Sequence, residues 1–194
     1  MKTEIFPDIQ GGKNWSKKIR IVELRKDDVS SLKLKYRYVT SNYYDLSILR
    51  EADSWKIELT LKPLEKIIEK KDKSELFEFY VEEPRVFAAE IDGEQIGWIE
   101  LGYHKWNNRM RVWEFLIKEE FRRRGIGTLL MKHAVKVAKE KGARMLVLET
   151  QTCNVPAIDF YLKFGFKLIG FDVAAYSNED IEKKEVRLEL GLEL

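Results

Sequence analysis

Cysteine and histidine are scarce in this 194-residue chain, which holds one cysteine, Cys153, and two histidines, His104 and His133. A single cysteine excludes an internal disulfide and is typical of proteins from reducing compartments, so we expect a cytoplasmic location. A structural zinc site needs about four cysteine or histidine ligands. We therefore expect no metal centre.

Long apolar runs are also lacking. No apolar run approaches the roughly 20 residues that a membrane-spanning helix needs, and the first residues lack the apolar core of a signal peptide. An excess of one charge is missing too, because 35 basic and 33 acidic residues leave a net charge of +2. Proteins that bind nucleic acid or membranes by bulk attraction carry a larger excess. We expect neither as a partner.

Apolar residues make up 44% of the chain and include five tryptophans and ten phenylalanines, which is enough for a sizeable core. From the length we expect a single domain over residues 1–194. Within it, residues 1–85 are expected to form an N-terminal strand and helical part. Residues 86–192, where the periodic pattern is sharper, are expected to form the catalytic core.

Hydrophobic periodicity predicts an α/β fold with a mixed, mostly antiparallel sheet. Helices are predicted directly after Pro63, after Gly127 and from Pro156, while residues 1–18 form an irregular lead-in and residues 27–50 fit neither pattern. The second half of the chain reads strand–helix–strand, and this βαβ unit is the expected core. The predicted strands are residues 19–24, 55–61, 86–91, 95–103, 111–117, 144–150, 166–173 and 185–190.

The segment 122–130 joins a predicted buried strand to a helix through two glycines, Gly125 and Gly127. Glycines let the backbone approach a ligand closely, and the N–H groups at a helix start attract anions. Three arginines directly before Gly125 add charge and bidentate donors. The segment therefore predicts a phosphate-binding loop.

Two kinds of phosphate loop compete for this segment. The dinucleotide fingerprint G-x-G-x-x-G needs a third glycine where the chain has Leu130, although Glu149 lies at the distance expected for its ribose acid. The pattern Arg-x-x-Gly-x-Gly at residues 122–127 instead resembles the acyl-CoA loop of the GNAT superfamily of N-acetyltransferases. Residues 154–166 are similar to the second GNAT block, at the distance that family expects. Two blocks together are far more specific than one.

The resemblance narrows at three short stretches. Residues 148–154, 169–172 and 176–178 are similar to the streptothricin acetyltransferases, bacterial resistance enzymes that acetylate an amine of the β-lysine part of that antibiotic. The general resemblance covers residues 86–192, and the narrower one is strongest over residues 108–192. It implies the GNAT, or acyl-CoA N-acyltransferase, fold with helices flanking the sheet. It also implies acetyl-CoA as co-substrate and no metal.

The resemblance further implies which residues hold acetyl-CoA. Backbone N–H groups at the helix start would bind the pyrophosphate, and the strand edge before the loop would pair with the pantetheine. Asn154 would contact the pantetheine amides, while its place at a helix start also suits an N-cap. The full set is Phe115, Leu116, Ile117, Arg122, Arg123, Arg124, Gly125, Ile126, Gly127, Thr128, Asn154, Ala157 and Tyr161.

A few side chains are candidates for moving protons. Tyr161 is the candidate general acid, because a phenol of pKa about 10 can donate to a thiolate whose thiol has a pKa of about 8.5. The alternative, which its helical spacing permits, is a ring that only packs on the buried face of the helix. Glu114 and Glu149 rank together as catalytic carboxylates that could attract a cationic amine, with Glu100 as a third candidate. For each carboxylate, a partnered charge at the sheet rim is the competing interpretation.

The predicted activity is transfer of acetyl from acetyl-CoA to a primary amine by direct attack in a ternary complex, with the β-lysine amine of streptothricin as acceptor. An enzyme of the same fold acting on a protein N-terminus or a polyamine is one alternative. A CoA-binding module without catalysis is another, and the presence of both Asn154 and Tyr161 speaks against it. A small cationic amine is the expected partner. The choice between a monomer and a homodimer stays open.

Overall fold

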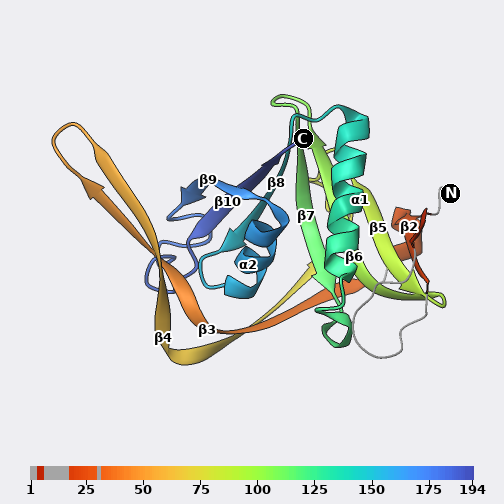
Figure 1. Cartoon of the computed structure of the whole chain (residues 1–194), viewed down its shortest axis with the longest axis horizontal. Coiled ribbons are helices and arrows are strands. Elements are labelled where there is room, and N and C mark those ends of the chain that lie inside the picture. Colours follow the sequence, from red (N-terminus) through yellow and green to blue (C-terminus); the bar gives the residue numbers. More distant parts are fainter. Residues whose placement is uncertain (1–3, 7–17, 30–31) are drawn as a thin grey trace. The chain divides into compact units, whose positions relative to one another are not determined.

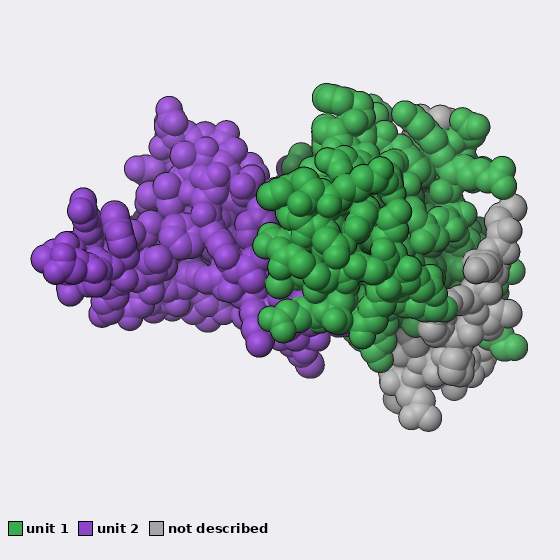
Figure 2. All heavy atoms as spheres, turned by 90° about the horizontal axis from the view of Figure 1, so that it is seen from above, with its two compact units in different colours: residues 1–36, 72–147, 193–194 green, residues 37–71, 148–192 purple. Residues whose placement is uncertain are grey.

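The computed structural model describes residues 4–6, 18–29 and 32–194. The chain forms two compact units, neither of which is continuous in sequence (Figure 2). The expected boundary at residue 85 therefore marks neither unit, and the single domain stays a prediction. Unit 1 holds residues 1–36, 72–147 and 193–194, and unit 2 holds residues 37–71 and 148–192.

Unit 1 contains the strand order β1-β2-β5-β6-β7-β8 (Figure 1). Neighbouring strands are antiparallel, except that β7 and β8 run parallel where Arg109–Arg111 pair with Met145–Val147. This arrangement confirms the mixed, mostly antiparallel sheet that the sequence predicted. The strands are β1 (Glu4–Phe6), β2 (Ile19–Leu24), β5 (Arg85–Ile91), β6 (Glu94–His104), β7 (Arg109–Ile117) and the first residues of β8 (Met145–Gln151).

The turn between β5 and β6 forms where the sequence placed it. Asp92 and Gly93 have φ angles of 51° and 84°, so both central residues are left-handed, as a two-residue type I′ hairpin requires. Glycine adopts this conformation freely, and aspartate tolerates it better than most residues. The turn sets the register beside it, and a bulge at Ile96 then shifts the register along the rest of β6, because Glu90 pairs with Gln95 but Ala89 pairs with Gly97.

Both faces of the unit 1 sheet are covered. The helix α1 (Ile126–Lys141) packs against β5, β6 and β7 (Figure 1). Its buried residues form one stripe: Ile126, Leu129, Leu130, Met131, Ala134, Val137 and Ala138. An apolar cluster contains alternate residues of the strands together with Val29 of the 3-10 helix and Leu76 after β4. The strand residues are Leu24, Leu34, Val86, Ala88, Trp98 and Leu116. Since side chains alternate along a strand, residues that share a parity with Trp98 on β6 lie on this second face.

Unit 2 contains the strand order β8-β10-β9, where β9 (Lys167–Asp172) and β10 (Arg187–Glu193) are antiparallel. The helix α2 (Val155–Phe164) follows β8 directly. Most of a long two-stranded ribbon also belongs to this unit. The ribbon is formed by β3 (Lys33–Arg50) and β4 (Trp55–Glu75), and it turns between Glu51 and Ser54 (Figure 1).

The prediction of a helix after Pro63 is wrong, because that segment lies inside β4. Leu64, Ile67 and Ile68 happen to have helical spacing, but the segment pairs with β3 instead. Ion pairs between the two strands, such as Arg37 with Glu69 at 2.5 Å, accompany this pairing. Pro63 is tolerated because a strand in a two-stranded ribbon has an edge that needs no ladder N–H.

The other uncertain segments of the sequence take definite forms. Residues 27–50, which fitted no pattern, contribute to a short 3-10 helix at Lys26–Val29 and to β3. The expected lead-in over residues 1–18 includes β1, and its remainder lies largely outside the described residues. In the part of the chain that the structure describes, no helix is both long and apolar enough to span a membrane.

Candidate active site

The loop before α1 closes with a left-handed residue, as its glycine predicted. Gly125 is the N-cap of α1 and has φ 82°, and Leu129 N–H donates to its carbonyl at 3.0 Å as the first helical hydrogen bond. The N–H groups of the first turn, at Ile126, Gly127 and Thr128, consequently lack acceptors within the helix. Their partial positive charge makes this end of α1 suited to an anion.

The three arginines of the loop have different environments. The Arg122 guanidinium donates from Nε to the Ile117 carbonyl at 3.0 Å, so it ties the loop back to the end of β7. Arg123 is exposed and has φ 58°, an unfavourable conformation for a residue with a Cβ. Arg124 is exposed as well and lies over the Phe121 ring at 5.8 Å. Arg123 and Arg124 are thus better placed than Arg122 to meet a phosphate.

A bulge interrupts β7 in front of this loop. Glu100 on β6 pairs with Glu114, but Leu101 pairs with Val112, so Trp113 is the extra residue. Bulges bend a strand and often lie beside active sites, where they redirect backbone groups. Beyond the bulge, Phe115, Leu116 and Ile117 pair with β6 along one edge. The predicted pairing of their other edge with pantetheine stays a prediction.

Gly97→Ala is expected to damage this strand edge. An added Cβ at Gly97 would lie 2.6 Å from Ile117 Cδ1 and 3.0 Å from the Leu116 carbonyl oxygen. The side chain can rotate away, but the carbonyl moves only with β7. We expect the free energy of unfolding to fall by about 1–3 kcal/mol, measured by urea denaturation.

Gly170→Ala in β9 is the matched control, because its Cβ would find no atom nearer than Glu189 Cβ at 3.8 Å. Titration with CoA would report whether the shifted β7 edge also binds the nucleotide more weakly. A Gly97→Ala protein as stable as the parent would contradict this prediction, because β7 could then move away from the added Cβ without a loss of free energy of unfolding.

Two carboxylates of unit 1 are withdrawn from water. Glu114 accepts a hydrogen bond from the Tyr36 hydroxyl at 2.5 Å, and burial raises the pKa of Glu114 despite that bond. Glu100 is only 1% exposed and accepts a hydrogen bond from the Phe77 N–H at 2.6 Å. Burial raises the pKa of Glu100 to about 7, and the neighbouring Glu114 charge adds to the shift. The sequence placed Glu100 third among the candidate bases and gave no sign of this environment.

The helix α2 begins and ends as the sequence predicted. The Asn154 side chain accepts a hydrogen bond from the Ala157 N–H at 3.4 Å, which makes Asn154 an N-cap. Gly165, with φ 117°, ends the helix. Tyr161 is 8% exposed, and its ring packs against Phe160 and Phe166 at centroid distances of 5.5 and 5.8 Å. The packing explains why Tyr161 is held in place, and its role as an acid stays a prediction.

Glu149 has an environment very different from that of Glu114. Its carboxylate accepts a hydrogen bond from the Tyr176 hydroxyl at 3.2 Å and lies 3.7 Å from the Arg187 guanidinium. Asp172 lies 3.5 Å from the same guanidinium. Burial raises the pKa of Tyr176, and the Glu149 charge adds to this effect, so the phenol stays protonated. Glu149 is therefore a partnered charge, whichever further role it has.

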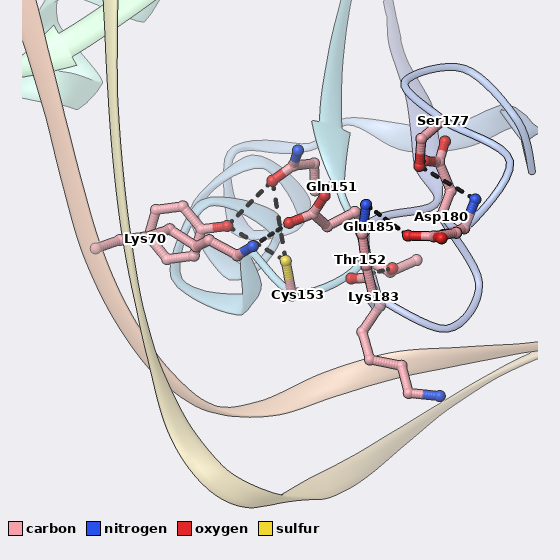
Figure 3. Close-up of polar contacts among 11 residues, drawn as sticks. Lys70, Gln151, Thr152, Cys153, Ser177, Asp180, Lys183 and Glu185 are labelled. Carbon is pink, nitrogen blue, oxygen red and sulfur yellow. Dashed lines mark hydrogen bonds and ion pairs between the residues drawn. The ribbon is translucent and has the colours of Figure 1, made fainter.

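Cys153 is a small buried residue, as expected, and not an activated nucleophile. Its sulfur lies 3.3 Å from the Tyr38 hydroxyl, which also donates to Gln151 at 3.2 Å (Figure 3). Burial raises the pKa of the Cys153 thiol, so the thiolate is disfavoured at neutral pH. Beside this group, Lys70 forms an ion pair with Glu185 (Figure 3). Among the described residues, no group of three histidine, cysteine, aspartate or glutamate side chains gathers to hold a metal.

The predicted site residues therefore fall into two sets. Unit 1 brings together the bulged strand, the arginine loop and the start of α1, including Glu114 and the residues from Phe115 to Thr128 named above. Unit 2 holds the second set, Glu149, Asn154, Ala157 and Tyr161, along the end of β8 and the first turns of α2. Each set lies at a strand-to-helix connection, where the first N–H groups of the helix have no partner within the helix and can bind a ligand.

Comparison with known sequences finds relatives of this chain. The sequence profile of the family described as Acetyltransferase (GNAT) matches residues 52–166. The streptothricin acetyltransferase of Streptomyces lavendulae is 38% identical over 89 residues, which are 46% of this chain and 47% of that protein. The chain spans about half the length of the curated relatives it matches.

Two solved structures are similar over a longer part of the chain. The crystal structure of nourseothricin acetyltransferase is 27% identical with a TM-score of 0.71, covering 90% of this chain and 98% of that one. The other is a Bacillus anthracis protein, assigned as a streptothricin acetyltransferase and solved with acetyl coenzyme A. It is 26% identical with a TM-score of 0.72, covering 91% of this chain and 97% of that one. This coverage extends further into residues 1–85 than the family profile, which begins at residue 52.

Proposed function

The chain belongs to the GNAT acetyltransferase family, as its sequence predicted, and from this premise we propose that it transfers acetyl from acetyl-CoA to a primary amine of streptothricin. The observation that best supports the acceptor is the similarity of nearly the whole chain to two streptothricin-type acetyltransferases. The family match also removes the dinucleotide-binding interpretation of the loop.

The start of α1 supports the binding of the CoA pyrophosphate. Gly125 is left-handed, and the first-turn N–H groups of Ile126, Gly127 and Thr128 lack helical acceptors. The exposed Arg123 and Arg124 supply formal positive charge to the same anion. When bound, acetyl-CoA supplies the thioester carbonyl that the amine attacks.

Glu114 is our choice for the group that takes the proton of the amine. A lysine-type amine of pKa about 10.4 is almost fully protonated at pH 7, a handicap of about 4.6 kcal/mol for attack. Glu114 is half-buried among acidic neighbours, Asp72 and Glu78, which favour proton uptake. Glu149 shares the single Arg187 guanidinium with Asp172 and Glu189, so this group keeps a negative charge that suits it to attract the cationic amine.

Tyr161 completes the proposed reaction. The ammonium gives its proton to the Glu114 carboxylate, and the nitrogen lone pair then forms a bond to the thioester carbon. As the carbon–sulfur bond breaks, the Tyr161 phenol protonates the departing sulfur, and the nitrogen loses its second proton to solvent as the amide forms. Tyr161 then regains a proton from solvent, and Glu114 releases the proton that it took. A backbone N–H at the free edge of the bulged β7 would stabilise the oxyanion of the intermediate.

Gly127→Glu is expected to weaken CoA binding by at least tenfold, because it places a carboxylate in the first turn of α1, where the pyrophosphate charge is proposed to lie. Isothermal titration with CoA would measure the change. Lys139→Gln, exposed in the last turn of the same helix, is the control because it alters the net charge equally. Equal affinities of the two variants would place the phosphates elsewhere.

The function is tested by CoA release from acetyl-CoA with a panel of streptothricin, spermidine, lysine, an aminoglycoside and a peptide with a free N-terminus. Turnover that is fastest with streptothricin supports the proposal. Faster turnover with the peptide or spermidine would support acetyl transfer but identify that amine, and not streptothricin, as the preferred acceptor. Acetyl-CoA binding without any turnover would favour the CoA-binding module.

A further inference from the structure

Two glutamates lie directly opposite each other on the unit 1 sheet. Glu100 on β6 pairs with Glu114 on β7, and Glu100 shares the sheet face of Trp98, away from α1. Directly opposed residues have Cβ atoms about 4.5–5.5 Å apart, and like charges there are destabilising. Glu100 is 1% exposed, so water screens this repulsion poorly.

Among the described residues, the charged groups with the largest effect on the pair are acidic. On its other side Glu100 pairs with Val86 of β5, which carries no charge. The Phe77 N–H fixes one oxygen of Glu100, and the Tyr36 hydroxyl fixes one oxygen of Glu114. The charged groups that add to the pKa shifts are Asp72, from the end of β4, and Glu78, from the segment after it, and both are acidic.

Two opposed carboxyl groups with further acidic groups nearby share one proton more readily than they carry two negative charges. The proton belongs on Glu100, because Glu100 is fully buried whereas Glu114 is partly exposed and accepts a hydroxyl hydrogen bond as a carboxylate does. Glu114 is then the ionised member of the pair at neutral pH. When Glu100 also ionises, its charge makes Glu114 a stronger base.

We propose that Glu100 is a positioning residue for acetyl transfer, which acts through the opposed Glu114 by holding or releasing a proton and so sets the pH range in which Glu114 accepts the proton of the amine. This inference rests on the proposed function, in which Glu114 is the base. It assigns Glu100 no contact with the substrate. Loss of the Glu100 proton raises the basicity of Glu114, and the reaction becomes faster as pH rises through neutrality.

The test is the pH profile of kcat/KM for the best amine of the panel. For the parent protein we expect a step near pH 7 in addition to the steady rise from deprotonation of the amine. Glu100→Gln keeps the size and the Phe77 hydrogen bond but cannot titrate, so the step should vanish. The ratio of kcat/KM at pH 8.5 to that at pH 6 should fall by about tenfold, the effect of one pKa unit on Glu114.

Because the readout is a ratio between two pH values, a general loss of folded enzyme in Glu100→Gln cancels from it. Glu23→Gln is the matched control, since Glu23 lies in the same sheet and is paired instead with Arg85 at 2.7 Å. The control should keep the step. A step that persists in Glu100→Gln overturns the proposal.

A second measurement does not depend on turnover. Carbon-13 NMR of protein with labelled glutamate carboxyls follows the titration of Glu100 directly, with assignment from the Glu100→Gln spectrum. We expect a midpoint near neutrality that falls by about one unit in Glu114→Gln. A Glu100 midpoint that ignores Glu114→Gln overturns the coupling. If the coupling between Glu100 and Glu114 is present but no amine is acetylated, the proposed function is wrong while the coupled titration of the two glutamates stands.

Discussion

Replacing Tyr161 by phenylalanine is expected to lower kcat by about a hundredfold or more, the usual contribution of a well-placed general acid. The substitution removes only the hydroxyl. The ring contacts with Phe160 and Phe166 stay, so α2 should keep its position in unit 2. The affinity for acetyl-CoA should change much less than kcat, because the proposed reaction uses the phenol proton only as the carbon–sulfur bond breaks.

Steady-state kinetics with the best amine, together with calorimetric titration of acetyl-CoA, would separate these two effects. Tyr103→Phe is the matched control, because it removes a phenol that donates to Asn108 at 2.7 Å beside a hairpin turn. The control should retain the parent kcat. Turnover of Tyr161→Phe that equals the parent from pH 6 to 9 would leave Tyr161 with a packing role only.

Glu100→Gln is expected to raise the free energy of unfolding at pH 8 by roughly 3 kcal/mol and to change it little at pH 4. The pKa of Glu100 is about 7 in the folded chain and 4.5 ordinarily, so the folded state holds the proton more tightly. Between these values the folded chain binds more protons than the unfolded chain, and stability is lost as pH rises. Glutamine has no charge to bury, so the variant escapes this loss.

Urea denaturation of parent and variant at both pH values measures the difference. Glu23→Gln provides a control of opposite sign, because the Arg85 hydrogen bond lowers the pKa of Glu23 and the ionised carboxylate stabilises the fold. That variant should be less stable than the parent at pH 8. A Glu100→Gln protein with parental stability at pH 8 would mean that Glu100 ionises without cost.

The sequence predicted the parts of the fold whose signals are local. The strand β7, the start of α1 at Gly125 and the Asn154 cap of α2 each depend on residues within one or two turns of chain. The segment after Pro63 shows the opposite case. Its apolar spacing fitted a helix, and only pairing with a strand more than a dozen residues away decides that it is extended.

The sequence nominated the residues of the candidate site but did not indicate their surroundings. Glu114 and Glu149 looked equivalent because nothing local distinguishes them. Their difference arises from Tyr36 and from Arg187, which are distant in sequence. The opposition of Glu100 and Glu114 depends on the register that the Trp113 bulge shifts by one residue, and a bulge has no clear sequence signal here.

The ribbon of β3 and β4 has a consequence for how the chain behaves at high concentration. In the described two-stranded sheet β4 has a single neighbour, so its outer edge offers unpaired backbone groups to a strand of another molecule. Charged side chains oppose such additions, and β4 carries many: Lys56, Glu58, Lys62, Glu65, Lys66, Glu69, Lys70, Lys71, Asp72, Lys73 and Glu75. These charged residues, which the sequence alone suggests are simply solvent-exposed, thus oppose aggregation through the edge of β4. Acetylation of these lysines would weaken that protection.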